Sequence, residues 1–215
     1  GFKSKWLGGD LRFNAAVFQI TINDLQSGFV SLLAGGAVTL ENAGQARIRG
    51  AEFDTTYVPF PMLNPGFVIS ANMGYLDAIY TDYRDGAGYD EKTGLFSNNI
   101  DFTGNDIVRT PKYSGGIVLT QTIPIGYRHE LELSVDGYYN SGFSYTPQNT
   151  VTEPSYTLVK GRVSYFFIPW NLRLTAFGKN LTKEHYHYSK FQTDFGVNQT
   201  LAPPIQYGLR LEWTY

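Results

Sequence analysis

The last nine residues of the chain alternate between apolar or aromatic side chains and polar residues or glycine. The apolar set is Tyr207, Leu209, Leu211, Trp213 and Tyr215. Side chains on a β-strand point to opposite faces with a period of two, so this segment has one apolar face and one polar face. The pattern predicts a strand whose apolar face lies against a protein core or against lipid.

The composition predicts an all-β protein. Aromatic residues make up 16% of the 215 residues, only 17% are charged against about 25% in ordinary domains, and 23 are glycine. No stretch reaches the roughly 18 to 20 apolar residues of a membrane-spanning helix. A net charge of −2 provides no basic surface for nucleic acid, and the absence of cysteine excludes disulfides and thiolate metal sites.

Alternating segments separated by turn residues predict about nine strands. They lie near residues 1–6, 11–26, 44–58, 66–80, 112–122, 129–141, 155–167, 171–181 and 205–215. The segments between them alternate between short and long. Outer-membrane β-barrels have short turns on one rim and long loops on the other, whereas sandwiches have no reason to sort their loops. The sequence therefore predicts an antiparallel transmembrane barrel wall, although periodicity alone also permits a soluble sandwich.

Aromatic residues gather where the predicted strands end. One set lies near the short turns (Tyr57, Phe60, Phe167, Trp170, Tyr215) and another near the long loops (Tyr80, Tyr83, Tyr139, Tyr156). Two bands of this kind are typical of the aromatic girdles at lipid–water interfaces. The alternation changes phase after Val17 and again near Gly50, which predicts either a β-bulge or a strand that runs beyond the membrane.

Four motifs resemble those of one membrane family. They are residues 1–4 (GFKS) with 11–18 (LRFNAAVF), residues 42–46 (NAGQA) with 50–52 (GAE), residues 177–182 (FGKNLT), and the terminal aromatic strand. In this order they resemble the C-terminal part of a TonB-dependent receptor. The resemblance implies a 22-stranded barrel around a plug domain, of which residues 1–215 form about the last nine strands, with no second domain.

The resemblance also implies a function and partners. We expect uptake of a scarce nutrient across the bacterial outer membrane, most often a ferric siderophore, powered through TonB-ExbB-ExbD. The barrel-assembly machinery would read the terminal strand, and lipopolysaccharide and lipid would surround the wall. No cofactor, enzymatic activity or nucleic acid is implied. The alternatives are uptake of saccharide, haem or cobalamin, a passive porin-like channel, an outer-membrane enzyme, and a soluble β-sandwich binding module.

Three groups of residues are candidates for a site. Charged residues fall on the parity predicted to face the lumen, namely Glu132, Asp136, Lys160, Arg162, Arg173 and Arg210, together with Lys179 and Glu212. Their opposite signs on adjacent strands predict cross-strand pairing, and their functional interpretation is contact with a plug or guidance of a charged ligand.

The second candidate group is His185, Tyr186, His187 and Tyr188, at the base of the last long loop. On a strand, both imidazoles of a His-x-His pair share a face and could contact a metal chelate, with Glu184 or Asp194 as further ligands; packing of loop aromatics is the alternative. The third group is the acidic, glycine-rich loop of residues 82–91. Its spacing departs from that of an EF-hand, so an ordinary solvated loop is expected there.

Overall fold

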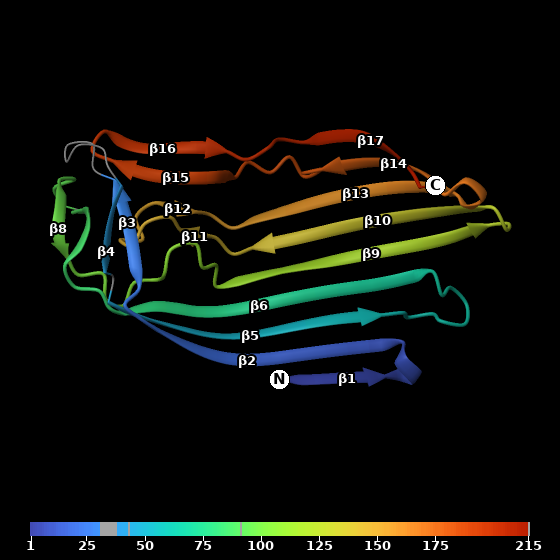
Figure 1. The fold of residues 1–215 in the computed structure, drawn as a ribbon, viewed down its shortest axis with the longest axis horizontal. Helices are drawn as coiled ribbons and strands as arrows, with labels where there is room; N and C mark the ends of the chain where they lie inside the picture. Colours follow the sequence, from blue (N-terminus) through green and yellow to red (C-terminus); the bar gives the residue numbers. More distant parts are fainter. Residues whose placement is uncertain (31–37, 43, 91, 215) are drawn as a thin grey trace.

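The computed structural model describes residues 1–30, 38–42, 44–90 and 92–214. In this part of the chain, nine strands form one antiparallel sheet in which each strand pairs with the next along the chain (Figure 1). They are β1 (Phe2–Trp6), β2 (Leu11–Asn23), β5 (Gln45–Tyr57), β6 (Phe67–Asp82), β9 (Tyr113–Ile125), β10 (His129–Asn140), β13 (Tyr156–Phe167), β14 (Leu172–Lys179) and β17 (Gln206–Trp213). The nine predicted strands are confirmed. The second ends at Asn23 rather than at residue 26, and the fifth continues to Ile125.

The connections sort to opposite ends of the sheet (Figure 1). The short ones include two single-turn 3₁₀ helices, η1 (Leu7–Gly9) and η2 (Ile168–Trp170). Each long one contains a small hairpin, and we call the end that carries these hairpins the rim. The hairpins are β3–β4 (Gln26–Val30, Val38–Asn42), β7–β8 (Gly86–Tyr89, Phe96–Ile100), β11–β12 (Phe143–Ser144, Thr152–Glu153) and β15–β16 (His187–Thr193, Gly196–Leu201). None of the four was predicted from the sequence.

The main sheet has one apolar face and one polar face. Residues paired directly across antiparallel strands share a face, so the register assigns Leu133, Val163 and Ala176 to the apolar face. The apolar face is uncovered: Val17 is 79% exposed and Leu209 is 76% exposed. Among the described residues, the buried apolar side chains all lie toward the rim. A sandwich would bury this face under a second sheet, so the soluble-sandwich alternative does not fit.

The predicted β-bulge in the second strand is wrong. Pairing of β2 with β5 runs without a shift from Leu11–Tyr57 to Asn23–Gln45, and β5 pairs with β6 without a shift from Ala46 to Tyr57, the one irregularity lying between Gln45 and Ala46. What changes along β2 is the polarity of the side chains on its apolar face. Beyond Val17 the apolar face carries Gln19, which accepts a hydrogen bond from Arg49 at 2.8 Å. The strands therefore continue past the apolar band, in agreement with the second of the two sequence-based alternatives.

A small aromatic core forms where the strands reach the rim. Ala46, Tyr80, Tyr83 and Phe102 are buried together, and successive rings contact edge to face at 5.0 Å between centroids. Assigning Tyr80 and Tyr83 to an exposed girdle was therefore wrong, because they are only 1% and 2% exposed. Residues of this rim core come from β5, from β6 and the residue that follows it, and from the segment after β8, so the sequence order hides their proximity.

Exposed aromatics do occur near this end of the apolar face. Tyr75 pairs with Tyr113, with 5.3 Å between ring centroids, and Tyr139 is 46% exposed. At the short-turn end Phe60 and Trp170 are exposed, whereas Tyr215 lies outside the described residues. Within the described part, no helix has the length and apolarity needed to cross a bilayer.

Candidate functional site

The rim loops are joined to one another by hydrogen bonds. The Asn105 side chain donates to the Pro147 carbonyl at 2.8 Å, and the Arg109 backbone donates to the Ser144 carbonyl at 2.8 Å. In addition, the Asp106 N–H donates to the Asn149 side chain at 2.9 Å. The loop between β6 and β9 is thereby held against the loop between β10 and β13.

A buried carboxylate joins the second of these loops to the last one. The Glu153 side chain is 1% exposed, and its oxygens lie 3.0 Å from Lys190 Nζ and 3.2 Å from His187 Nδ1. The His187 backbone N–H donates to the same carboxylate at 3.0 Å. A charge removed from water needs such partners, because an unpaired one is very costly. Glu153 is therefore the tie between β12 and β15.

The surroundings of Glu153 determine its ionisation. Burial raises the pKa of the Glu153 carboxyl, but the hydrogen bonds from Lys190 and from the His187 backbone outweigh burial, so the pKa lies below its ordinary value. Burial and the neighbouring Glu153 charge raise the pKa of Tyr145 to about 12. Tyr145 consequently stays neutral at physiological pH and donates to the His187 carbonyl at 2.8 Å.

The four predicted loop residues have different surroundings. The His187 side chain contacts the Glu153 carboxylate. Because β15 begins at His187, His185 does not lie on the same strand. His185 and Tyr188 are exposed. His185 therefore lies outside the strand on which the His-x-His argument depends, and ligand binding by these residues stays a prediction. Among the described residues, no group of three His, Cys, Asp or Glu side chains could hold a metal ion.

Tyr186 instead belongs to a group of tyrosines at the rim. Its ring stacks on Tyr156 with 4.7 Å between centroids and an interplanar angle of 18°, and Tyr138 lies 6.3 Å from Tyr156. The Asn140 side chain donates to the Tyr138 hydroxyl at 3.1 Å. We call Tyr138, Tyr156 and Tyr186 the tyrosine cluster. Its first two members share the parity of Asp136 and Lys160, which the sequence could have revealed, but the position of Tyr186 depends on loop folding.

The predicted charged residues all lie on the polar face of the sheet. The register assigns Glu132, Asp136, Lys160, Arg162, Arg173 and Arg210 to it. Two ion pairs cross from β10 to β13: Lys160–Asp136 at 3.4 Å and Arg162–Glu132 at 3.2 Å.

On the two following strands the contacts differ. Arg210 approaches Glu212 of its own strand at 3.8 Å, and the Arg173 guanidinium lies 5.4 Å from the centre of the Phe166 ring. Lys160, Arg162 and Arg210 line a hollow of about 530 Å³ on this face. The polar face therefore presents a wall of mixed charge below the tyrosine cluster.

The acidic loop is more ordered than expected. Its middle forms β7, whose four residues are buried, so the prediction of an ordinary solvated loop is wrong for this part. Asp82 pairs with Arg84 at 3.3 Å, and Asp90 accepts hydrogen bonds from Thr93 that lower the pKa of its carboxyl. Glu91 lies outside the described residues.

The terminal strand joins the apolar face. The apolar residues of β17 are Tyr207, Leu209, Leu211 and Trp213, and each of them is at least 67% exposed. On β14 they lie opposite Gly178, Ala176, Leu174 and Leu172, in that order. These residues form an apolar edge on the outermost strand of the sheet.

Comparison with known proteins identifies the family. The profile described as "TonB dependent receptor-like, beta-barrel" matches residues 1–181. The chain belongs to the TonB-dependent receptor family. The resemblance deduced from the four motifs is therefore confirmed. Comparison with curated protein sequences finds no match.

Solved structures share the fold of this receptor segment. The ferric yersiniabactin uptake receptor FyuA of Yersinia pestis superposes with a TM-score of 0.72 at 16% identity, over 96% of this chain and 28% of FyuA. The siderophore receptor PiuA of Acinetobacter baumannii superposes with a TM-score of 0.71 at 20% identity, over 99% of this chain and 27% of PiuA. BauA, the ferric preacinetobactin receptor of the same organism, superposes with a TM-score of 0.64 at 20% identity, over 95% of this chain and 27% of BauA. The chain thus spans less than a third of each of these proteins.

Proposed function

We propose that residues 1–215 form one segment, about nine strands, of a closed 22-stranded barrel in the bacterial outer membrane. In the described chain, β1 pairs only with β2 and β17 only with β14, which leaves two open edges. A bilayer core offers no hydrogen bonds to unpaired backbone groups, so spanning sheets close on themselves. Further strands of the same receptor would complete both edges. The apolar face then meets lipid and the polar face lines the lumen.

We further propose that the receptor takes up a ferric siderophore and that TonB-ExbB-ExbD supplies the energy. The observation that carries this proposal is the tyrosine cluster, held by interlocked loops above a wall of mixed charge. Aromatic rings provide stacking surface and phenol groups provide hydrogen bonds, which together suit an organic iron chelate. The family membership and the siderophore receptors among its structural neighbours support it.

The other parts of the chain have roles consistent with transport rather than catalysis. The exposed apolar edge formed by Tyr207, Leu209, Leu211 and Trp213 would be the signal that the barrel-assembly machinery recognises. The charged residues of the polar face would contact a plug domain or guide an anionic chelate.

Ligand binding by the full-length receptor tests the proposed substrate class. Intrinsic fluorescence should be quenched saturably by a ferric siderophore, and not by cobalamin, haem or an oligosaccharide. Tyr186→Ala should weaken binding by about 2- to 10-fold, the value of one aromatic contact. Tyr127→Ala is the matched control, because Tyr127 is 99% exposed at the opposite end. A response to sugar or cobalamin alone would overturn the substrate class, and uptake without TonB would favour a passive channel.

A further inference from the structure

The position of Tyr186 in the tyrosine cluster is not set by the pairing of the main sheet. Tyr186 lies in the connection between β14 and β15, which covers residues 180–186. It belongs to no strand, so its ring reaches Tyr156 of β13 only because the connection is held in one conformation. The contacts that hold the connection therefore decide whether the two rings stack.

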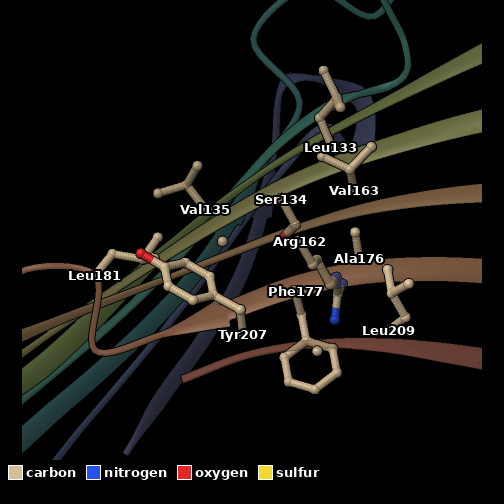
Figure 2. A pocket seen from close by; sticks show the side chains of 13 residues that line it. Leu133, Ser134, Val135, Arg162, Val163, Ala176, Phe177, Leu181, Tyr207 and Leu209 are labelled. Carbon is tan, nitrogen blue, oxygen red and sulfur yellow. The ribbon is translucent and has the colours of Figure 1, made fainter. Parts of the chain in front are cut away.

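The start of this connection is fixed against the wall. The Asn180 side chain donates to the Glu184 carbonyl at 2.9 Å and accepts from the Glu184 N–H at 2.8 Å. The Leu181 N–H donates to a carbonyl of β13 at 2.8 Å, and Figure 2 shows the Leu181 side chain beside the Tyr207 ring. These contacts end at Glu184, two residues before Tyr186, so the position of Tyr186 depends on what holds the residues that follow.

Two side chains of the loop between β10 and β13 hold both backbone groups of His187, the next residue. The His187 N–H donates to the Glu153 carboxylate at 3.0 Å, and the Tyr145 hydroxyl donates to the His187 carbonyl at 2.8 Å. That N–H belongs to the planar peptide unit that joins Tyr186 to His187. The Tyr186 carbonyl of the same unit accepts from the Ala202 N–H at 2.9 Å. The backbone on the C-terminal side of Tyr186 is therefore held at three points.

Glu153 acts on the other ring of the stack as well. Only two residues separate it from Tyr156, in the segment that leads from β12 into β13. Its carboxylate lies 3.0 Å from Lys190 Nζ, and Lys190 also donates to a carbonyl of β12 at 2.8 Å. One buried ion pair thus connects the segment before Tyr156 with the strand that follows Tyr186.

The Tyr145 ring is itself held by two cations. The Arg109 guanidinium lies 5.4 Å from the ring centre and Lys190 Nζ lies 5.8 Å from it, which are distances at which a cation attracts an aromatic face. The Tyr145 hydroxyl also lies 3.4 Å from the Glu153 carboxylate. Tyr145 and Glu153 therefore form one unit around the His187 backbone.

We propose that Glu153 and Tyr145 are positioning residues of the ligand site, which hold the backbone beside Tyr186 so that its ring is stacked before a ligand binds. The proposal rests on the proposed function, in which the tyrosine cluster contacts a ferric chelate. A surface that is already ordered loses less conformational entropy on binding. Neither residue belongs to the tyrosine cluster, so both act through Tyr186 rather than by contact with the chelate.

Contact between the two rings can be measured in the full-length receptor without a ligand. Photo-oxidation joins neighbouring phenol rings as dityrosine, and peptide mass spectrometry gives the yield of the Tyr156–Tyr186 product. Tyr145→Phe removes only the hydroxyl that holds the His187 carbonyl. It should lower the yield by about 2- to 10-fold, the range that the loss of one hydrogen bond allows. The matched control is Tyr80→Phe, which removes a buried rim phenol that is hydrogen-bonded to backbone elsewhere and should leave the yield unchanged.

Glu153→Gln is the second variant, and it covers the case in which Tyr145→Phe does not fold. It removes the charge that holds Lys190 and should lower the dityrosine yield as well. Its distance from the Tyr80 control makes a common cause through general loosening of the rim testable in the same experiment.

Ligand binding distinguishes an effect through Tyr186 from independent damage to the rim. Fluorescence quenching would be measured with the ferric complexes of a catecholate, a hydroxamate and citrate. Tyr145→Phe should weaken binding of the preferred complex by about 2- to 10-fold, as expected for Tyr186→Ala. The combined variant should bind no more weakly than Tyr186→Ala alone, because the effects of independent residues would multiply.

The two measurements keep this proposal apart from the proposed function. An unchanged dityrosine yield in Tyr145→Phe and Glu153→Gln would overturn the positioning role, as would an equal loss in Tyr80→Phe or multiplied effects in the combined variant. A reduced yield with no binding of any ferric complex by the wild type would support the positioning of Tyr186 and overturn the proposed substrate class only. A reduced yield with binding losses that do not multiply would support both.

Discussion

Glu153 shows how one side chain organises residues that are distant in the sequence. Its carboxylate contacts Lys190 and His187, more than 30 positions further along the chain. Breaking a buried ion pair by removing one partner costs about 3–5 kcal/mol, because the remaining charge stays buried without compensation. The Lys190 side chain is only 12% exposed, so it would be left in that situation.

We therefore expect Glu153→Gln to loosen the rim. Backbone amides in residues 141–155 and 184–204 should exchange with solvent at least about 100-fold faster, as a loss of 3 kcal/mol in local opening energy requires. Hydrogen–deuterium exchange of the full-length receptor measures this directly. Asp82→Asn is the control, since the Asp82–Arg84 pair is largely exposed and such pairs contribute about 0–1 kcal/mol. If hydrogen–deuterium exchange in these segments is unchanged in Glu153→Gln, Glu153 does not hold β12 and β15 together.

At the scale of elements, the long strands could be predicted because their apolar and polar residues alternate. In β10 the alternation of Leu131, Leu133 and Val135 with polar neighbours gives both the strand and its faces. The rim hairpins could not be predicted in this way. They are short, and β7 is buried among loops rather than between two unlike surroundings, so its sequence (GAGY) carries no alternation. Packing of loops distant in sequence decides their structure.

The same argument explains why the surroundings of Tyr80, Tyr83 and His187 could not be predicted. Tyr80 lies near the end of β6 and Tyr83 directly follows it. Tyrosine suits a membrane interface and a small core equally well. Only the return of Phe102 onto these rings determines which occurs. His187 similarly needs Glu153 of another loop to define its role. The two-residue alternation of strand side chains predicted which residues lie on the polar face. It could not predict contacts between loops that are distant in the sequence.

The link between β12 and β15 should depend on pH. The pKa of Glu153 is lower in the folded protein than the ordinary value of about 4.3, so its contribution to stability is fully present above that value. It is lost as the pH falls through the folded-state pKa. We expect rim amides in residues 184–204 to lose protection as the pH falls below the ordinary glutamate pKa, after correction for intrinsic exchange rates, while β9 and β10 remain protected. Glu153→Gln should lack this transition, and a parallel loss in both proteins would contradict the assignment.

At the scale of the whole molecule, this sheet reverses the arrangement of a soluble protein. Apolar side chains such as Val17 and Leu209 are largely exposed on the strands, while Ser134, Ser164 and Thr175 of the polar face are buried. The hydroxyls of Ser164 and Thr175 are hydrogen-bonded to each other at 2.9 Å. Exposed apolar area in water costs about 25 cal/mol per Å², so this surface suits the lipid environment proposed for it.

Adjacent residues on β9 test this arrangement. Ile117 is on the apolar face and 47% exposed, whereas Val118 lies opposite Asp136 on the polar face. Ile117→Arg should destabilise the full-length receptor in liposomes by about 2–4 kcal/mol, the cost of a cation in the middle of a bilayer. Val118→Arg inserts the same side chain beside a carboxylate and should change stability by less than about 1 kcal/mol. Urea unfolding in liposomes measures both. Equal destabilisation of the two variants would mean that the apolar face does not meet lipid.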